Sequence, residues 1–292
     1  KTDLACAVLE TGRFAMKTVA DVLGVSRSNL HDRVSGSAKP RRGYHKDKDA
    51  AVLPRIQALV AKRPTYGYRR ITALLNRELR TQGLPAVNHK RVYRIMERNN
   101  LLLQRSGVDR PERNHDGKVI MMRSNLRWCS DGLEFACWNG DVIRLAFLSD
   151  AHDREIISWR AVANAGIGGS DVRDMLLEAV ESRFGTHRAA YQVEVLSDNG
   201  SAYTARDTRI FAQQLGLKSC FTPVKSPQSN GRSEAFVKTL KRDYVRVNPL
   251  PNAETMLSLI GDWIEDYNEN HPHSGLKWKS PREFIRAKTE TA

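Results

Sequence analysis

Apolar residues recur at helical spacing in two separate stretches of the first third of the chain. In the earlier stretch, residues 18–30, they follow a helical period on both sides of Gly24, and Ser26 stands where a second helix would be capped. The pattern predicts a helix-turn-helix whose second helix would offer Arg27 and Asn29 to a DNA groove. An ordinary helical hairpin is the alternative interpretation.

The later stretch, residues 51–103, predicts a second helical module. An apolar stripe runs through residues 69–80, Gly83 and Pro85 break the pattern, and Asn88 can cap a further helix. The other faces of both helices carry many basic side chains, which could simply be solvated. Their density, together with nearby tyrosines, favours contact with a DNA backbone. The predicted contacts from this module are Arg69, Arg70, Lys90, Arg91 and Arg94.

Beyond residue 120 the pattern changes to short strand-like runs followed by helical periodicity. Strands that alternate with helices are typical of an α/β domain, and we expect one here. The predicted strands are 126–135, 142–149, 155–162 and 193–196, and the predicted helices are 171–184, 230–247 and 253–270.

The net charge of +14 is not spread evenly over the 292 residues. Residues 1–120 hold 25 Lys and Arg against 11 Asp and Glu, whereas residues 121–292 hold 22 of each kind. The whole positive excess therefore belongs to the part that carries the two helical patterns. This favours a polyanionic partner such as DNA over a merely solubilising surface.

Composition excludes several other classes of protein. With 40% apolar residues the chain can bury a core, and no apolar run approaches the roughly 18 residues needed to span a bilayer. The four cysteines form no CxxC pair and no zinc-finger spacing. We therefore expect no membrane association, no disulfide scaffold and no structural zinc, and we expect a reducing, cytoplasmic compartment.

Polar segments without periodicity separate these parts. The chain begins with Lys1 rather than Met, which leaves open a longer N-terminal module. The predicted division is a helix-turn-helix in 1–36, a linker in 37–50, a second helical DNA-binding module in 51–103, a linker in 104–120 and the α/β domain in 121–292.

Three acidic residues stand out by their context in the α/β domain. Asp131 lies inside the first predicted strand, where a carboxylate is costly to bury without a cation. Asp198 comes just after the strand that ends at Leu196, and ligands gather at such strand ends in open α/β sheets. Glu234 lies at the front of a predicted helix. Three converging carboxylates provide the oxygen ligands that a pair of hard divalent ions needs.

Each of these acidic residues also has a structural explanation, as an edge-strand charge, an Asx-type turn or a first-turn carboxylate near a helix dipole. Their joint pattern favours function. Asp198 and Glu234 are separated by 35 residues, and Lys238 and Lys241 follow Glu234 by four and seven residues. On a helix the last three side chains share one face. The two lysines are therefore predicted to contact DNA beside a metal-binding carboxylate.

Other candidates carry less weight. His271 and His273 flank Pro272 and could form a ligand pair, although a structural role is favoured. Asn199 could orient a water or a phosphate, or it could hold its own turn. The tryptophans expected in the core are Trp128, Trp138 and Trp263.

At the three acidic residues the chain resembles the D, D, 35, E signature of the retroviral-integrase superfamily. More narrowly, it resembles the insertion-sequence transposases of the IS-three family, close to the IS-two subgroup. The resemblance covers about residues 50–285. Its supporting motifs, in chain order, are YGYRRI at 66–71, KRVYRIM at 90–96, SPQSNG at 226–231, YN at 267–268, HPHS at 271–274 and SPRE at 280–283.

The resemblance implies an RNase H-like catalytic domain of the DDE type over residues 121–292. Asp131, Asp198 and Glu234 would be its catalytic residues and would hold two Mg²⁺ ions, with Mn²⁺ able to substitute. The implied activity is that of a transposase that binds terminal inverted repeats and cleaves and transfers DNA strands. The implied partners are double-stranded DNA of element ends and target and further copies of the same chain, in the bacterial cytoplasm at the nucleoid.

Two other functions stay open at this point. A DNA-binding regulator with a decayed catalytic domain would not need the intact acidic trio. A nuclease that only hydrolyses would need neither two helical DNA-binding modules nor a lysine at the position of Lys241.

Overall fold

The protein is represented by a computed structural model that describes residues 1–36, 49–104, 121–222 and 231–290. The chain divides into two compact units, residues 1–51 and 52–292. The predicted linkers lie almost wholly outside the described residues, as do residues 226–230 of the SPQSNG motif.

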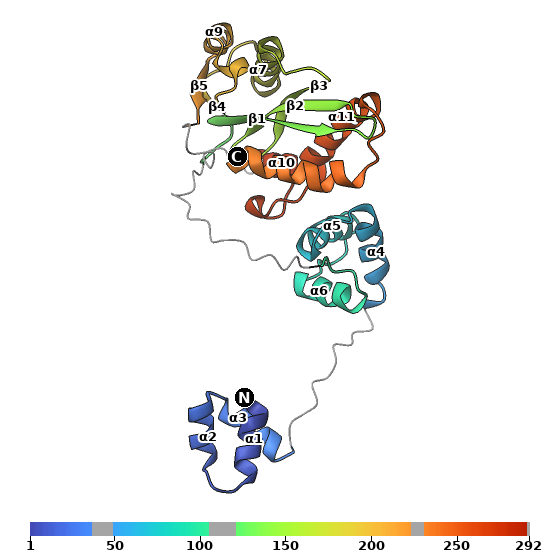
Figure 1. Cartoon of the computed structure of the whole chain (residues 1–292), viewed down its shortest axis with the longest axis vertical. Coiled ribbons are helices and arrows are strands. Elements are labelled where there is room, and N and C mark those ends of the chain that lie inside the picture. The colour runs from blue at the N-terminus through green and yellow to red at the C-terminus, as the bar shows by residue number, and fades with distance from the viewer. Residues whose placement is uncertain (37–48, 105–120, 223–230, 291–292) are drawn as a thin grey trace. The chain divides into compact units, whose positions relative to one another are not determined.

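The first unit contains the predicted helix pair and one further helix. Its helices are α1 (Thr2–Glu10), α2 (Met16–Leu23) and α3 (Arg27–Val34), shown in blue in Figure 1. Gly24 ends α2 with a φ of 60°, a conformation that glycine adopts without steric cost. A small core unites the three helices and consists of buried Ala5, Val19, Ala20 and Leu30.

The second unit begins with three helices that we call the three-helix module: α4 (Leu53–Lys62), α5 (Tyr68–Thr81) and α6 (His89–Arg98). The apolar pattern predicted α5 and α6 but not α4. The stripe expected on α5 faces inward, with Leu74 only partly buried. The fully buried members of this core on α5 and α6 are Ile71, Leu75, Leu79, Val92, Ile95 and Met96.

The two predicted helix caps behave differently. Asn88 caps α6, because its side-chain oxygen accepts a hydrogen bond from the backbone N–H of Lys90 at 2.8 Å. Ser26 precedes α3 without capping it, since its hydroxyl lies 2.9 Å from the Ser28 hydroxyl. The sequence positions of Ser26 and Asn88 were therefore sufficient to predict where the two helices start. They were not sufficient to predict which side chain forms the capping hydrogen bond.

A five-stranded sheet forms the centre of the α/β domain, in the order β3-β2-β1-β4-β5. The first three strands form an antiparallel meander, and β4 runs parallel to both β1 and β5. This arrangement confirms the expected RNase H-like fold class. The strands are β1 (Arg127–Ala136), β2 (Val142–Asp150), β3 (Ile156–Ala163), β4 (Val193–Ser197) and β5 (Leu217–Phe221).

Helices cover both faces of this sheet (Figure 1). On one face α7 (Gly169–Phe184) and α9 (Arg206–Gln214) pack over a core that includes Trp128 and Met175. On the other face α10 (Gly231–Asp243) and α11 (Ala253–Asn270) pack over a second core. The remaining short elements are α8 (Ser201–Thr204), η3 (Val245–Val247), η4 (Ser274–Leu276) and α12 (Pro281–Thr289).

Three sequence expectations for the α/β domain need correction. The helix expected over 230–247 ends at Asp243 and continues as the separate 3₁₀ turn η3. The strand β5 and the helix α9 were missed. In β5 a single side chain is fully buried, and its sequence has no alternating pattern. Trp138 is 73% exposed rather than buried, since β1 ends at Ala136 and the tryptophan lies in the following turn.

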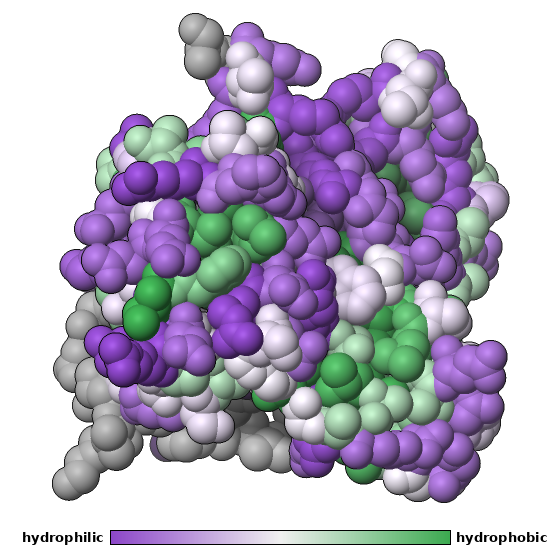
Figure 2. Space-filling view, turned by 90° about the horizontal axis from the view of Figure 1, so that it is seen from above, coloured by the Kyte–Doolittle hydropathy of each residue, from purple (hydrophilic) through white to green (hydrophobic). Residues whose placement is uncertain are grey.

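The hydrophilic character of the surface agrees with the composition of the sequence. The face shown in Figure 2 is mostly hydrophilic, with separate apolar patches between polar side chains. Among the described residues, no helix combines the length and the apolar character needed to cross a bilayer.

Candidate active site and DNA-binding surfaces

The strand register brings Asp131 and Asp198 to the same level of the sheet. Strands β1 and β4 are parallel neighbours, and their last paired residues are Cys129 and Leu196. Asp131 and Asp198 each follow this pair by two residues. Because parallel neighbours are about 4.8 Å apart, Asp131, midway along β1, lies at the level where β4 ends and Asp198 follows it.

Helix α10 carries Glu234 to the same end of the sheet. The helix packs against β1, and Phe236 lies over Phe147, with the ring centroids 4.5 Å apart. Phe147 is paired with Asp131 across β1 and β2, so it shares a face of the sheet with that carboxylate. Glu234 therefore lies in the first turn of a helix whose buried side is anchored beside Asp131.

The electrostatics of Asp131 show that the other two carboxylates act on it. Burial raises the pKa of Asp131, and the negative charges of Asp198 and Glu234 raise it further, although the Gly132 N–H donates a hydrogen bond to it. The charges of Asp198 and Asp131 also contribute to a raised pKa of Tyr203, whose main cause is burial. A bound cation would relieve the repulsion that Asp198 and Glu234 exert on Asp131.

The carboxylates nevertheless do not form a closed metal cage in this structure. Within the described ranges, no three His, Cys, Asp or Glu side chains are grouped closely enough to hold one metal ion. The Gly200 N–H donates to Asp198, as in an Asx-type turn, and Lys238 Nζ lies 2.9 Å from a Glu234 oxygen. The donor chemistry fits a hard divalent ion, and Glu234 would exchange its lysine partner for that ion.

The two lysines predicted to contact DNA have different surroundings. Lys238 is exposed and forms an i, i+4 ion pair with Glu234. Lys241 is half-buried, one turn further along α10. The buried stripe of this helix includes Leu240 and is continued by Tyr244, which agrees with the predicted division of faces.

Most of the other predicted DNA contacts are exposed side chains. Arg69 lies with its guanidinium carbon 5.5 Å from the centroid of the Tyr68 ring, so the arginine and the tyrosine form one flat surface. Arg91 is half-buried. The exposed predicted contacts are Arg27 and Asn29 on α3 and Arg69, Lys90 and Arg94 on the three-helix module.

Arg70 is the exception, because it belongs to a buried contact between the three-helix module and α10. Its guanidinium donates to Asp243 at 3.1 Å, and Asp243 is fully buried and also accepts from Thr65 at 2.7 Å. Burial lowers the pKa of Arg70, and the neighbouring Arg242 lowers it further. The ion pair gives Arg70 a structural role that the sequence did not predict, and it argues against the alternative of a merely solvated arginine.

Two further contacts complete this junction, which we call the module junction. Arg63 forms an ion pair with Asp266 of α11, and the Tyr66 hydroxyl lies 2.8 Å from His271 Nδ1. His271 is buried, and desolvation lowers its pKa well below the usual value, so its favoured structural role is confirmed. Sequence reasoning missed the junction because its partners are far apart in the chain and show no local pattern. Asn199 donates to the Thr222 carbonyl, which lies beyond β5, so this bond joins two segments rather than holding the turn of Asn199 itself.

Comparison with known proteins agrees with this architecture. Residues 122–227 and 215–281 match the integrase core domain, and residues 46–107 match the HTH-like domain. The chain is similar to the InsD transposase of insertion element IS2-9 from Escherichia coli (strain K12), with 47% identity over 290 residues, which are 98% of this chain and 94% of that protein.

Two more similarities concern shorter or more distant proteins. A protein of insertion element IS136 from Agrobacterium fabrum is 71% identical over 194 residues, which are 66% of this chain and all of that protein. The simian T-cell lymphotropic virus intasome superposes with a TM-score of 0.45 and 19% identity, over 72% of this chain and 69% of that chain.

Fold and domain matches thus define an integrase core preceded by a helix-turn-helix-like domain. At 47% identity over nearly its whole length, the chain belongs to the family of insertion-element transposases that includes InsD of IS2.

Proposed function

We propose that this transposase binds the terminal inverted repeats of its insertion element and cleaves and joins DNA strands at Asp131, Asp198 and Glu234. The observation that supports the proposal is that the negative charges of Asp198, which follows β4, and Glu234 of α10 both act on Asp131 of the neighbouring strand β1. Carboxylates close enough to raise the pKa of one of them are unfavourable by themselves, and they are expected where a protein holds divalent cations against phosphate oxygens.

The residues suit two Mg²⁺ ions, with Mn²⁺ as a substitute, because their donors are hard carboxylate oxygens. When bound, the two ions would activate the attacking hydroxyl and neutralise charge on the leaving oxygen. The chain's own part is to hold Asp131 and Asp198 on neighbouring strands. It also keeps Glu234 on a helix that the buried Phe236 fixes in place.

DNA recognition is assigned to the basic parts of the chain. Arg27 and Asn29 on α3 would enter a groove, and Arg69, Lys90 and Arg94 would contact phosphates. Lys238 and Lys241 would hold the strand that reaches Glu234. Pairing two element ends requires at least two such sites, so the active form would be a homo-oligomer on DNA, acting in the cytoplasm at the nucleoid.

Incubation with DNA that carries the element's terminal repeats separates this proposal from its rivals. With Mg²⁺ we expect strand transfer products, with Mn²⁺ the same products, and with Ca²⁺ binding with little turnover. Products of hydrolysis alone would favour a nuclease, and binding without any product would favour a regulator. Activity that persists in a chelator would remove the metal assignment.

A further inference from the structure

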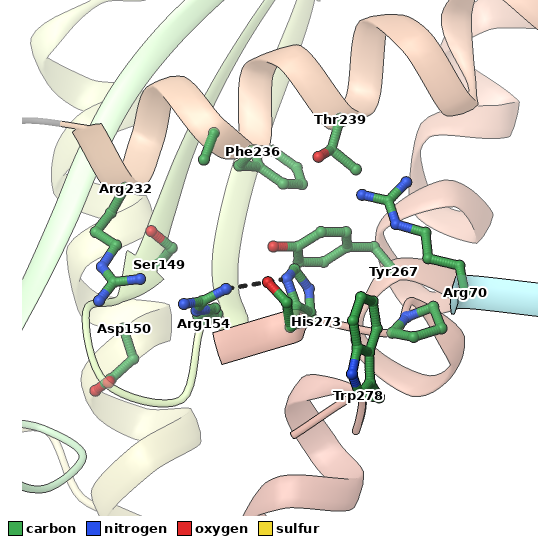
Figure 3. A pocket seen from close by; sticks show the side chains of 13 residues that line it. Arg70, Ser149, Asp150, Arg154, Arg232, Phe236, Thr239, Tyr267, His273 and Trp278 are labelled. Atoms are coloured by element: carbon green, nitrogen blue, oxygen red, sulfur yellow. Dashed lines mark hydrogen bonds between the residues drawn. The ribbon is translucent and has the colours of Figure 1, made fainter. Parts of the chain in front are cut away.

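A cavity of about 250 Å³ is lined by one side of α10. Its walls come from four segments that are far apart in the sequence, as Figure 3 shows. Arg232 of α10 lines the cavity two residues before Glu234, so these two side chains lie on different sides of the same turn. Arg154 follows β2, Arg70 comes from α5, and His273 precedes η4.

Positive charge in this cavity exceeds the negative charge available to balance it. Arg70 is neutralised by Asp243 of the module junction. Arg154 and Arg232 have no carboxylate within ion-pair distance among the described residues. Burial lowers the pKa of Arg154, and the positive charge of Arg232 adds to this effect. The guanidinium groups of Arg154 and Arg232 therefore line one cavity without a carboxylate partner in the described part of the chain.

Two hydrogen-bond donors in the cavity wall also lack acceptors. Arg154 Nε and His273 Nε2 are buried without a hydrogen-bond partner in the part of the chain that the structure describes. Arg154 Nη1 lies 3.4 Å from His273 Nδ1, and because a guanidinium only donates, Nδ1 must accept. The single proton of the neutral imidazole is then on Nε2. Buried donors without acceptors are rare, and they indicate a partner that the chain itself does not supply.

The histidine stays neutral in the free protein. Burial lowers the pKa of His273 to about 3, and the charge of Arg154 contributes to this shift. A charged imidazolium would be repelled by the two guanidinium groups. His273 therefore serves as a neutral N–H donor beside two cations.

The local backbone leaves space for the Arg154 side chain. A Cβ atom on Gly275 would overlap the Arg154 guanidinium, although Gly275 is not among the glycines with positive φ. Arg154 itself has a φ of 67°, which is costly for a residue with a side chain. Gly275 therefore leaves room for the Arg154 guanidinium in its present position, while Arg154 carries the cost of its backbone conformation.

One carboxylate among the lining residues, Asp150, does not neutralise the arginines. Its two oxygens accept backbone N–H groups, one from Asn125 at 2.6 Å and the other from His152 at 2.7 Å. Figure 3 shows its carboxylate directed away from Tyr267 and His273. The centre of the cavity is therefore left to the basic and neutral donors.

We infer that this cavity, which we call the phosphate pocket, binds one phosphodiester phosphate of a DNA strand that passes α10 on its way to Glu234. Two guanidinium groups and a neutral imidazole N–H match the oxygens of a phosphate, which is a tetrahedral anion without protons to donate. The assignment to DNA rests on the proposed function, whereas the affinity for phosphate does not.

The test uses the full chain and variants that change the pocket in two ways. Arg154→Gln and Arg232→Gln each remove one cation. Gly275→Ala keeps every charge but displaces the Arg154 guanidinium. Arg209→Gln is the matched control, since Arg209 is an exposed arginine of α9 on the opposite face of the sheet. Thermal unfolding of each variant in chloride shows whether it is folded.

The first measurement asks whether the pocket binds inorganic phosphate. Unfolding temperatures are compared in sodium phosphate and in sodium chloride of equal ionic strength. Wild type and Arg209→Gln are expected to be stabilised by phosphate, because a ligand that binds only the folded state raises the unfolding temperature. The three pocket variants are expected to lose this increment.

The second measurement identifies the source of the phosphate. Binding is measured to terminal-repeat duplexes in which one phosphate at a time is replaced by a neutral methylphosphonate. In wild type, one replacement is expected to weaken binding about tenfold to a hundredfold, as for one lost charge-assisted contact. In the pocket variants that same replacement is expected to have no further effect, whereas Arg209→Gln retains it.

The outcomes separate this inference from the proposed function. Phosphate stabilisation without any methylphosphonate position that depends on the pocket would mean a site for a free anion, and the DNA assignment would be wrong. Loss of neither signal in folded pocket variants would overturn the inference entirely. If the chain joins no DNA but the phosphate increment still depends on Arg154, the proposed function fails while the anion pocket stands.

Discussion

The two ends of α10 carry acidic side chains in opposite electrostatic settings. Glu234, in the first turn, shares a field with Asp131, and its one close cation is the exposed Lys238. Asp243, at the last position, is fully buried and is bound by Arg70, Arg242 and Thr65. One helix therefore joins a carboxylate cluster with an exposed lysine beside it to a buried carboxylate that two arginines bind.

In the proposed function, the first group of carboxylates serves catalysis, whereas Asp243 holds the module junction together. A buried carboxylate with two arginines and a hydroxyl has its desolvation offset inside the protein, and it needs no external partner. Asp131, whose pKa is raised by burial and by the charges of Asp198 and Glu234, stays ionised only at a cost, which a bound cation would remove. The comparison yields four predictions, ordered from the largest expected effect to the smallest.

The substitution Glu234→Gln keeps the size of the side chain but removes a charged oxygen ligand. Strand cleavage and joining should fall by about a thousandfold or more, while binding to terminal-repeat DNA and the free energy of unfolding change little. Glu254→Gln, in the exposed first turn of α11, is the matched control. Near wild-type joining by Glu234→Gln would remove this residue from the active site.

The substitution Asp243→Ala should mainly reduce stability. It leaves Arg70 and Arg242 without their buried counter-ion, and breaking a buried ion pair in this way costs about 3–5 kcal/mol. Urea unfolding measures the effect, and Asp262→Ala on the exposed side of α11 should stay within about 0.5 kcal/mol of wild type. The double variant with Arg70→Ala should recover part of the loss. A loss no larger than that of the control would show that the junction adds little.

The substitution Lys241→Glu probes the face that α10 shares with Glu234. Repulsion is added to a lost phosphate contact, so strand joining on pre-cut ends should fall more than tenfold, whereas Lys241→Ala should cost about 1–2 kcal/mol. Footprints of the terminal base pairs across a salt series, at matched thermal stability, are the measurement. Normal joining by a folded Lys241→Glu would mean that this face does not contact DNA.

The smallest effect concerns pH and the second ion pair of the module junction. Burial alone would raise the pKa of Asp266, but hydrogen bonds from Arg63 and Tyr244 and the charge of Arg63 together lower it. A lowered pKa in the folded state stabilises the protein above the unfolded value of about 3.9, and this contribution is lost as the pH falls through the folded pKa.

Replacing Arg63 with Ala should therefore destabilise the protein at pH 6, and the difference from wild type should shrink as the pH falls below about 4. Urea unfolding at a series of pH values measures that difference. A difference that stays constant across this range would assign the effect of Arg63 to packing alone.

Much of the candidate site could be predicted because its signals are local. Asp198 follows a short apolar strand, Glu234 opens an amphipathic helix, and the 35 residues between them are counted directly in the sequence. Each signal depends on residues within one strand or one helix. The short strand-like runs and the helical period also predicted most of the sheet. They predicted α10 and α11 as well, which cover the same face of that sheet.

The elements that the pattern missed lack such a local signal. In β5 a single side chain is fully buried, and apolar and polar residues do not alternate along the strand. Trp138 follows the buried Cys137, yet the turn after β1 directs the tryptophan to solvent. The sequence by itself could not distinguish these cases, because burial depends on what packs against a segment.

The amino-acid sequence alone determined the three carboxylates, their order and spacing, and the concentration of positive charge in residues 1–120. Only the tertiary structure decided which charges are compensated. Arg70 and Asp243 are separated by 173 positions, and the phosphate pocket draws its walls from four segments. Periodicity reports contacts within about one helical turn or one strand, whereas the energy of a buried charge depends on partners that folding brings from elsewhere in the chain.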